Sequence, residues 1–130
     1  MGTILKLFKH LSIDDVQKDF NKAYPFLNIE FYNKSMLPAR QRINKGTSLK
    51  MAGLREEGVL KASPWMTVKD LERIFREKFG PVVQVTRKSG RVWLETNMTD
   101  SWTLEAQNER GSELAEPLKR TGTDNLPDVY

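Results

Sequence analysis

The sequence predicts an α+β protein built from two consecutive strand–helix–strand units. Two amphipathic helical segments are each flanked by short apolar or alternating strands, and this order occurs twice along the chain. Capping residues and the Pro and Gly positions mark the ends of both helices. The expected architecture is a ferredoxin-like tandem βαβ repeat of order β-α-β-β-α-β-β. Both helices should then pack on one face of a mixed or antiparallel sheet.

The first unit begins with an apolar strand near residues 4–8. Ser12 starts a helix whose apolar positions recur at helical spacing, and Ser12 with Asp15 resembles an N-terminal capping box. Pro25 ends this helix. Strict alternation of apolar and polar residues over 27–32 then predicts a half-buried strand.

The second unit has the same order of elements. A strand is expected at 58–62, and Thr67 caps a helix that should end at Gly80. Alternation over 83–86 predicts the next strand, and a tight turn leads to a returning hairpin strand at 91–96.

The two units, residues 3–34 and 58–89, align when Leu5 is placed on Leu60, with a slip of a single position before the second strand. The agreement runs through cap and core positions, as in the pairs Ser12 and Thr67, Asp15 and Asp70, and Phe20 and Phe75. We interpret it as an internal duplication. The alternative is that any two amphipathic βαβ units look alike, because their caps and cores obey the same constraints. In either case residues 1–108 are expected to form one domain.

Two segments do not fit this pattern. Residues 35–57 form a long basic connector, and a connection of that length is usually functional or disordered. Residues 109–130 form a polar, acidic tail that we expect to be disordered. Residues 1–96 hold 18 basic and 10 acidic side chains, a balance of +8, whereas residues 97–130 hold 3 basic and 7 acidic ones, a balance of −4. This asymmetry indicates an anionic partner, or a tail that folds back over the body.

Composition narrows the class of protein. The chain has no cysteine, so disulfides, thiolate metal sites and cysteine nucleophiles are excluded. No apolar run approaches the roughly 20 residues that span a bilayer, and the first residues lack the features of a signal peptide. We therefore expect a cytoplasmic protein without a membrane association, a metal or a cofactor.

From Met66 onward the chain resembles a family of small, uncharacterised bacterial α+β proteins. The resemblance covers residues 66–108 and is most specific in the hairpin. The residues that carry it are Met66, Thr67, Val68, Leu71, Glu72, Phe79, Gly80, Gln84, Val85, Arg87, Lys88, Ser89, Gly90, Trp93, Leu94, Glu95, Thr96, Thr99, Asp100, Trp102, Thr103, Leu104, Gln107 and Asn108. It implies a shared fold and brings no catalytic or binding residues with it.

No residue pattern indicates catalysis. The single histidine, His10, lacks the partners that a general base or a metal ligand needs. Asp14 and Asp15 suit the first turn of a helix, and Glu56 and Glu57 suit a solvated loop. We therefore predict no enzymatic activity, although an enzyme of unrecognised class is a lower-ranked alternative.

A binding surface is the better prediction. Cations surround the hairpin tip and recur in the connector, and an aromatic residue lies beside the tip: Arg87, Lys88, Arg91, Trp93, Arg40, Arg42 and Lys45. Exposed rings beside arginines are typical of sheets that stack single-stranded nucleic acid. The spaced aromatic consensus of such sheets is absent, however. We therefore favour an interpretation in which Trp93 fills the core and Trp102 closes the fold behind the hairpin.

The leading functional hypothesis is a non-enzymatic interaction module that binds a protein partner through its sheet face or sheet edge. The alternative is a nucleic-acid-binding protein that uses the basic connector and the hairpin tip. A homodimer formed through an unpaired sheet edge is a further alternative.

Overall fold

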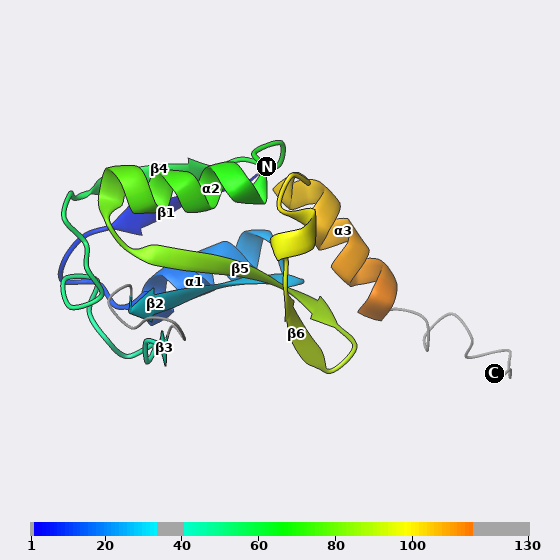
Figure 1. Cartoon of the computed structure of the whole chain (residues 1–130), viewed down its shortest axis with the longest axis horizontal. Helices are drawn as coiled ribbons and strands as arrows, with labels where there is room; N and C mark the ends of the chain where they lie inside the picture. The colour runs from blue at the N-terminus through cyan, green and yellow to red at the C-terminus, as the bar shows by residue number, and fades with distance from the viewer. Residues whose placement is uncertain (1, 34–40, 116–130) are drawn as a thin grey trace, which may run out of the picture.

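The computed structural model describes residues 2–33 and 41–115, which form an α+β fold of three α-helices and two antiparallel sheets. In chain order the elements are β1 (Thr3–Leu7), α1 (Ile13–Ala23), β2 (Leu27–Asn33), β3 (Gln41–Arg42), β4 (Gly58–Ala62), α2 (Val68–Ile74), the π-helix η1 (Phe75–Phe79), β5 (Val82–Ser89), β6 (Val92–Glu95), the 3-10 turn η2 (Asn97–Thr99) and α3 (Leu104–Ala115). Figure 1 shows their arrangement.

The strands of the two units pair with each other rather than within a unit. β1 pairs antiparallel with β4, and Leu5 lies opposite Leu60 at the middle of that pair. The second sheet has the order β3-β2-β5-β6, and Glu30 lies opposite Gln84 at the middle of the β2–β5 pair. In Figure 1 the two sheets lie one above the other, with α2 beside β4 and α3 at the end near β6.

The expected ferredoxin-like sheet is not confirmed, nor is the packing of two helices on one face. Side chains of the helices occupy the strand edges that a single sheet would need. The Gln17 side chain in α1 donates to the Ile29 carbonyl oxygen over 2.8 Å. The Glu72 carboxylate in α2 accepts from the Val85 backbone N–H over 2.9 Å. Each helix therefore lies beside a strand of its own unit, and the strands pair across the units.

The first helix forms as its sequence predicts. Ser12 and Asp15 make both hydrogen bonds of a capping box: the Ser12 hydroxyl accepts from the Asp15 N–H, and the Asp15 carboxylate accepts from the Ser12 N–H. The second helix begins at the Thr67 cap but changes after Ile74 into a π-helix that ends at Gly80. The Gly80 N–H accordingly donates to the Phe75 carbonyl oxygen, five residues back.

One hydrophobic core joins both units. Its largest fully buried side chains come from strands and helices of both halves and from the segments after β3 and β6: Phe20, Phe31, Phe75, Phe79, Leu5, Leu7, Ile13, Leu27, Ile29, Leu49, Leu71 and Leu104. The Phe31 ring meets the Phe75 ring edge-on at a centroid distance of 5.7 Å. This contact ties β2 to the second helix and so links the two units.

The connector and the tail differ from their predictions. Residues 41–57 belong to the fold, because Leu49, Ala52 and Leu54 are buried in the core. The sequence predicts a tail from residue 109, but α3 continues to Ala115 and packs on β5 and β2. Its buried Gly111 lets the helix approach the Phe26 side chain closely, since an added Cβ would lie 2.6 Å from the Phe26 Cβ. The rest of the predicted tail, 116–130, lies outside the described residues.

We expect Asp15→Asn to lower the melting temperature at neutral pH and to matter progressively less as the pH falls. The Ser12 backbone N–H, which donates to the carboxylate, holds the pKa of Asp15 below its usual range. A lowered native pKa stabilises the fold above the pKa of the unfolded chain, and this contribution disappears as the pH falls through the native pKa. Thermal melts of both proteins between about pH 7 and about pH 2.5 measure the difference. Asp19→Asn, outside the capping box, is the control. A difference that stays constant with pH would contradict the assigned hydrogen bond.

Candidate binding groove on the sheet face

A polar groove lies between α1 and the outward face of the four-stranded sheet. Its larger part has a volume of about 510 Å³ and is lined by Gln17, Asn28, Glu30, Arg42, Ile43, Asn44 and Lys45. Asn28 and Glu30 are there because β2 alternates, so the residues between its buried Leu27, Ile29 and Phe31 face outward. We call this feature the polar groove.

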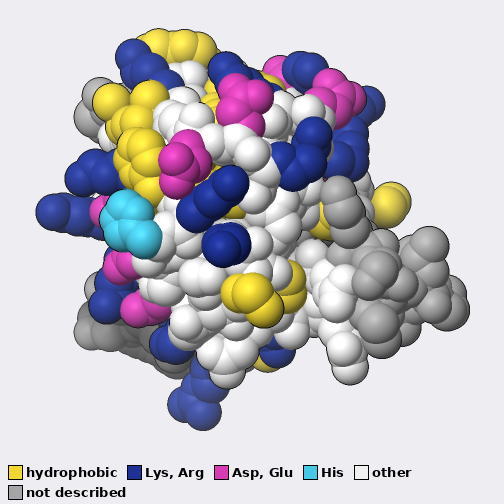
Figure 2. Space-filling model, turned by 90° about the vertical axis from the view of Figure 1, so that its left-hand side faces the viewer, with side chains coloured by type: hydrophobic (Ala, Val, Ile, Leu, Met, Phe, Trp, Pro, Cys, Tyr) yellow, Lys and Arg dark blue, Asp and Glu magenta, His cyan; other side chains and the backbone are white. Residues whose placement is uncertain are grey.

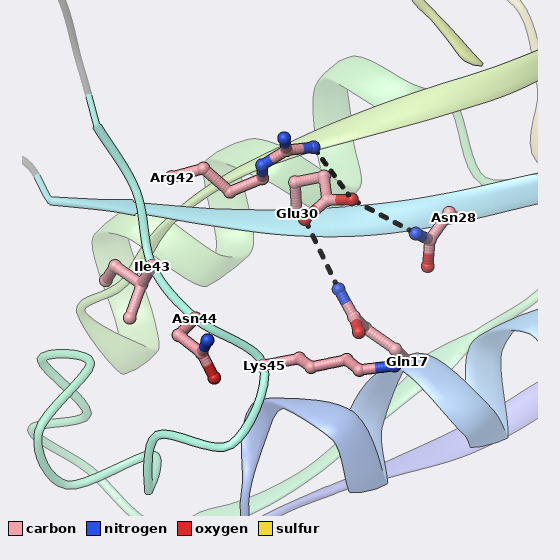
Figure 3. A pocket seen from close by; sticks show the side chains of 7 residues that line it. All are labelled: Gln17, Asn28, Glu30, Arg42, Ile43, Asn44 and Lys45. Carbon is pink, nitrogen blue, oxygen red and sulfur yellow. Dashed lines mark hydrogen bonds and ion pairs between the residues drawn. The ribbon is translucent and has the colours of Figure 1, made fainter. Parts of the chain in front are cut away.

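Glu30 is the centre of the groove. Its carboxylate accepts hydrogen bonds from the Gln17 and Asn28 amides over 3.4 and 3.2 Å and lies 3.7 Å from the Arg42 guanidinium. Figure 3 shows these three side chains converging on Glu30 from α1, β2 and β3, with Asn44 and Lys45 on the segment after β3. The Glu30 side chain retains only 16% of its exposure. The groove thus has an anionic floor surrounded by amides and two cations.

A second polar pair extends this arrangement across the sheet. Gln84 lies opposite Glu30, and its amide donates to the Glu72 carboxylate over 3.2 Å. On one side the helix supplies the amide (Gln17) and the strand the carboxylate (Glu30). On the other side the helix supplies the carboxylate (Glu72) and the strand the amide (Gln84). Carboxylates and amides therefore accompany the cations on these two strands, so positive charge is not concentrated there.

The groove continues toward the hairpin. A smaller hollow of about 240 Å³ shares Gln17 and Asn28 with the first and is also lined by Lys18, Asn21 and Trp93. Trp93 is 41% exposed on the strand β6, so the expectation that it fills the core is wrong. It pairs with Lys88, on the same sheet face as Gln84, and the Lys88 ammonium lies 5.6 Å from the centre of the ring.

The hairpin cations do not form one site. Arg87 faces the opposite side of the sheet, where it donates to the Gln107 side chain over 2.8 Å and lies over the Trp102 ring at 5.8 Å. Burial, and secondarily the positive charge of Arg110, lowers the pKa of Arg87. Arg87 therefore serves the packing of α3, with Trp102 beside it on that side of the sheet. Arg91 is exposed at the tip.

The connector cations are divided as well. Arg42 and Lys45 line the polar groove, whereas Arg40 lies outside the described residues. Figure 2 views the end of the molecule that carries the loop between β1 and α1 and the connector, with basic and acidic side chains interspersed over it. The expected basic surface is thus represented here by scattered cations, several of them paired with carboxylates.

Several of the residues considered for catalysis make contacts within the fold. His10 stacks on Phe8 at a centroid distance of 6.3 Å, Asp14 pairs with Lys18 at 3.1 Å, and Glu57 accepts from the Lys9 backbone N–H. Within residues 2–33 and 41–115, no group of three or more His, Asp or Glu side chains could hold a metal ion. Within the same ranges, each helix is too short or too polar to cross a bilayer.

Comparisons of this chain with family models, with curated proteins and with solved structures all end without a match. The resemblance over residues 66–108 therefore stays a prediction, and the groove has to be interpreted from its own chemistry.

Sequence reasoning missed most of the groove. The prediction centres on cations and a ring, and of those Arg42, Lys45 and Trp93 line it. It leaves out the amides that line the rest: Gln17, Asn21, Asn28 and Asn44. A signal is present for Asn28 and Glu30, which alternate with the apolar residues of a predicted strand. The position of α1 beside β2 carries no local sequence signal, so the contribution of Gln17 could not be foreseen.

Proposed function

We propose that the protein is a non-enzymatic interaction module whose polar groove binds an extended segment of a protein partner. The observation that carries this proposal is the set of side-chain amides along the groove, from Asn44 at one end to Asn21 at the other. An extended peptide presents alternating N–H and C=O groups. The amide nitrogens of Gln17, Asn21 and Asn28 already donate within the protein, so these side chains offer their oxygens as acceptors. The Asn44 oxygen accepts from the Gly46 N–H, so Asn44 offers its amide N–H groups as donors. The groove therefore suits recognition of a main chain more than of a single side chain.

Trp93 supplies the apolar contact at one end of the groove. Half-exposed aromatic residues with little conformational freedom contribute strongly to protein interfaces. The same strand leaves Val92 and Leu94 exposed at 55% and 43%. Because β6 is the last strand of the sheet order, a partner strand could add to its outer edge. A partner could therefore contact the sheet face beside Trp93 and also pair with the outer edge of β6.

Nucleic acid is the second candidate, because Arg42, Lys45 and Trp93 line the same groove. Two observations favour a peptide instead. The carboxylate of Glu30 lies at the floor, where it would repel a phosphate, and Arg42 already lies beside that carboxylate. Lys18 is likewise paired with Asp14. A neutral or mixed-charge polypeptide suits this surface better than a polyanion does.

The cytoplasmic location expected from the sequence belongs to this proposal, as does the duplication of one βαβ unit. The strand pairs support the duplication, because Leu5 and Glu30 lie opposite their own counterparts in the second unit, Leu60 and Gln84. Isolated bridges at the two helix starts are counterparts as well: Ser12 to Ser48 and Thr67 to Thr103. The pairs Gln17–Glu30 and Glu72–Gln84 also lie at equivalent positions of the two units, with the amide and the carboxylate exchanged.

Selection from a display library of random linear peptides tests the proposed function. We expect peptides that bind the wild-type protein and lose about tenfold or more in affinity to the double variant Asn28→Ala/Trp93→Ala, because it removes the apolar contact and an amide that lines both parts of the groove. Trp65→Ala is the matched control, since Trp65 is 72% exposed and does not line the groove. Failure to select any peptide, or equal affinity for the double variant, would contradict the proposal.

A further inference from the structure

The strand β6 has an unpaired edge. It is the last strand in the order β3-β2-β5-β6, and within residues 2–33 and 41–115 β5 is the one strand that pairs with it. The strand at the other end of this sheet, β3, has only two residues. Figure 1 shows the β5–β6 hairpin at the lower side of the molecule, away from the β1–β4 pair. An exposed edge of this kind can pair with a strand of another chain.

The backbone groups at the centre of β6 point toward this open edge. Residues of an antiparallel pair alternate between those that exchange hydrogen bonds and those that do not. Trp93 lies opposite Lys88, whose backbone N–H donates to the Phe26 carbonyl oxygen, on the side of β2, over 2.9 Å. Lys88 and Trp93 therefore do not exchange hydrogen bonds with each other. It follows that the N–H and C=O groups of Trp93 point away from β5.

The side chains of β6 lack the features that usually protect an edge strand. Protected edges carry lysine, proline or a bulge, which prevent pairing with another chain. β6 instead presents Val92, Trp93 and Leu94, all of them exposed. Because side chains alternate along a strand, Val92 and Leu94 lie on one face of the sheet and Trp93 lies on the other. A strand that pairs with this edge therefore covers apolar surface on both faces.

The charges at the two ends of β6 are opposite. Arg91 precedes the strand and Glu95 ends it, and both side chains are exposed. Arg91 forms no ion pair with the residues that the structure describes. The Glu95 carboxylate accepts one hydrogen bond, from the Asn97 amide to its Oε1 over 3.1 Å, so its other oxygen is available. The edge thus runs from a cation through three apolar residues to an anion.

We infer that a second copy of this chain pairs with the β6 edge, antiparallel and about a two-fold axis at Trp93. In this register the two Trp93 residues lie opposite each other, and their outward backbone groups form hydrogen bonds. Val92 then lies opposite Leu94, and Arg91 lies beside Glu95 at both ends of the pair. The charges select this register, because a parallel pair would bring like charges together. The contact is small, so the dimer should be weak and depend on concentration.

This dimer goes beyond the peptide binding proposed above and does not require it. The two-fold axis is perpendicular to the sheet, so both copies present the same sheet face and their Trp93 rings become neighbours. The polar grooves of the two copies then lie on one face of a continuous sheet. The second copy occupies the edge of β6, and the groove on the face stays open to a peptide.

Sedimentation equilibrium of the full chain over a range of concentrations tests the dimer. We expect the mass of the wild-type protein to rise from that of the monomer toward twice that value. Arg91→Glu and Glu95→Arg should each weaken self-association about tenfold or more, since like charges then meet at both ends of the pair. The double variant Arg91→Glu/Glu95→Arg should restore it, because opposite charges meet again in exchanged positions. Lys61→Glu, which changes an exposed cation on β4, is the matched control and should have no effect.

An equimolar mixture of the two single variants is the sharpest form of this test. The Arg91→Glu protein carries two anions along its β6 edge, and the Glu95→Arg protein carries two cations. Each should therefore associate with the other more tightly than with itself. Circular dichroism spectra identical to that of the wild-type protein confirm that both variants are folded.

A wild-type protein that stays monomeric at millimolar concentration would overturn this inference. So would self-association that Arg91→Glu leaves unchanged, a double variant that stays as weak as the single ones, or a mixture that does not associate. The dimer and the peptide-binding groove fail independently, because Asn28→Ala removes an amide of the groove and leaves β6 unchanged. Asn28→Ala should therefore leave self-association at the wild-type level.

Discussion

Phe31→Ala is expected to reduce the free energy of unfolding by about 3–5 kcal/mol, a large part of the stability of a small domain. Phe31 is completely buried and meets the Phe75 ring edge-on. Removing it leaves a cavity at the contact between β2 of the first unit and the second helix. Chemical denaturation followed by tryptophan fluorescence measures the loss.

Phe31→Leu is the control for this prediction. It keeps most of the buried volume, so its cost should stay below about 1.5 kcal/mol. A Phe31→Ala protein whose stability falls by no more than that of Phe31→Leu would contradict the packing of the two units through this ring. In that case the two sheets would have to be held together by other contacts.

Among single Gly→Ala substitutions, we expect Gly80→Ala to lower the free energy of unfolding the most. Gly80 ends the π-helix with a φ of +117°, which a residue with a Cβ adopts only with strain. A Cβ would also collide with the Gly53 carbonyl oxygen and approach the Arg55 side chain. Strain of this kind costs about 1–3 kcal/mol, and the collision with a backbone atom adds to it. Thermal unfolding of the variant measures the combined cost of the backbone strain and the collision.

Gly90→Ala separates the two causes. Gly90 has a φ of +61° at the hairpin tip, and nothing lies within 4 Å of an added Cβ. Its substitution should therefore cost only about 1 kcal/mol, the penalty of the left-handed conformation. Equal losses for Gly80→Ala and Gly90→Ala would contradict the close approach of Gly53 to Gly80.

The elements themselves follow from local sequence patterns. The capping box of Ser12 and Asp15, the Thr67 cap and the Gly80 stop all lie where the sequence predicts them. Alternation along 27–32 predicts both the buried Phe31 and the outward Glu30. These features are predictable because each depends on residues within a few positions along the chain.

The pairing of the strands could not be predicted in this way. A βαβ order usually indicates two parallel strands in one sheet, whereas here β1 pairs with β4 and β2 with β5. The side chains that cover the strand edges, Gln17 and Glu72, carry no mark of that role in the sequence. The same limit applies to the polar groove, because it requires α1 to lie beside β2. The same limit explains why the sequence favours a core position for Trp93. The hairpin strand is apolar in sequence, but all four residues of β6 are exposed.

Binding of a polypeptide in the polar groove is tested most directly by NMR titration. The ¹⁵N-labelled protein is titrated with a peptide from the display selection and, separately, with a random single-stranded RNA pool, at low and at physiological salt. We expect the peptide to shift the Gln17, Asn21 and Asn28 amides and the Trp93 indole, and these shifts should persist at physiological salt. Shifts caused by RNA should be absent or disappear as the salt concentration rises. Shifts from RNA at Arg42, Lys45 and Trp93 that persist at physiological salt, with none from the peptide, would contradict it.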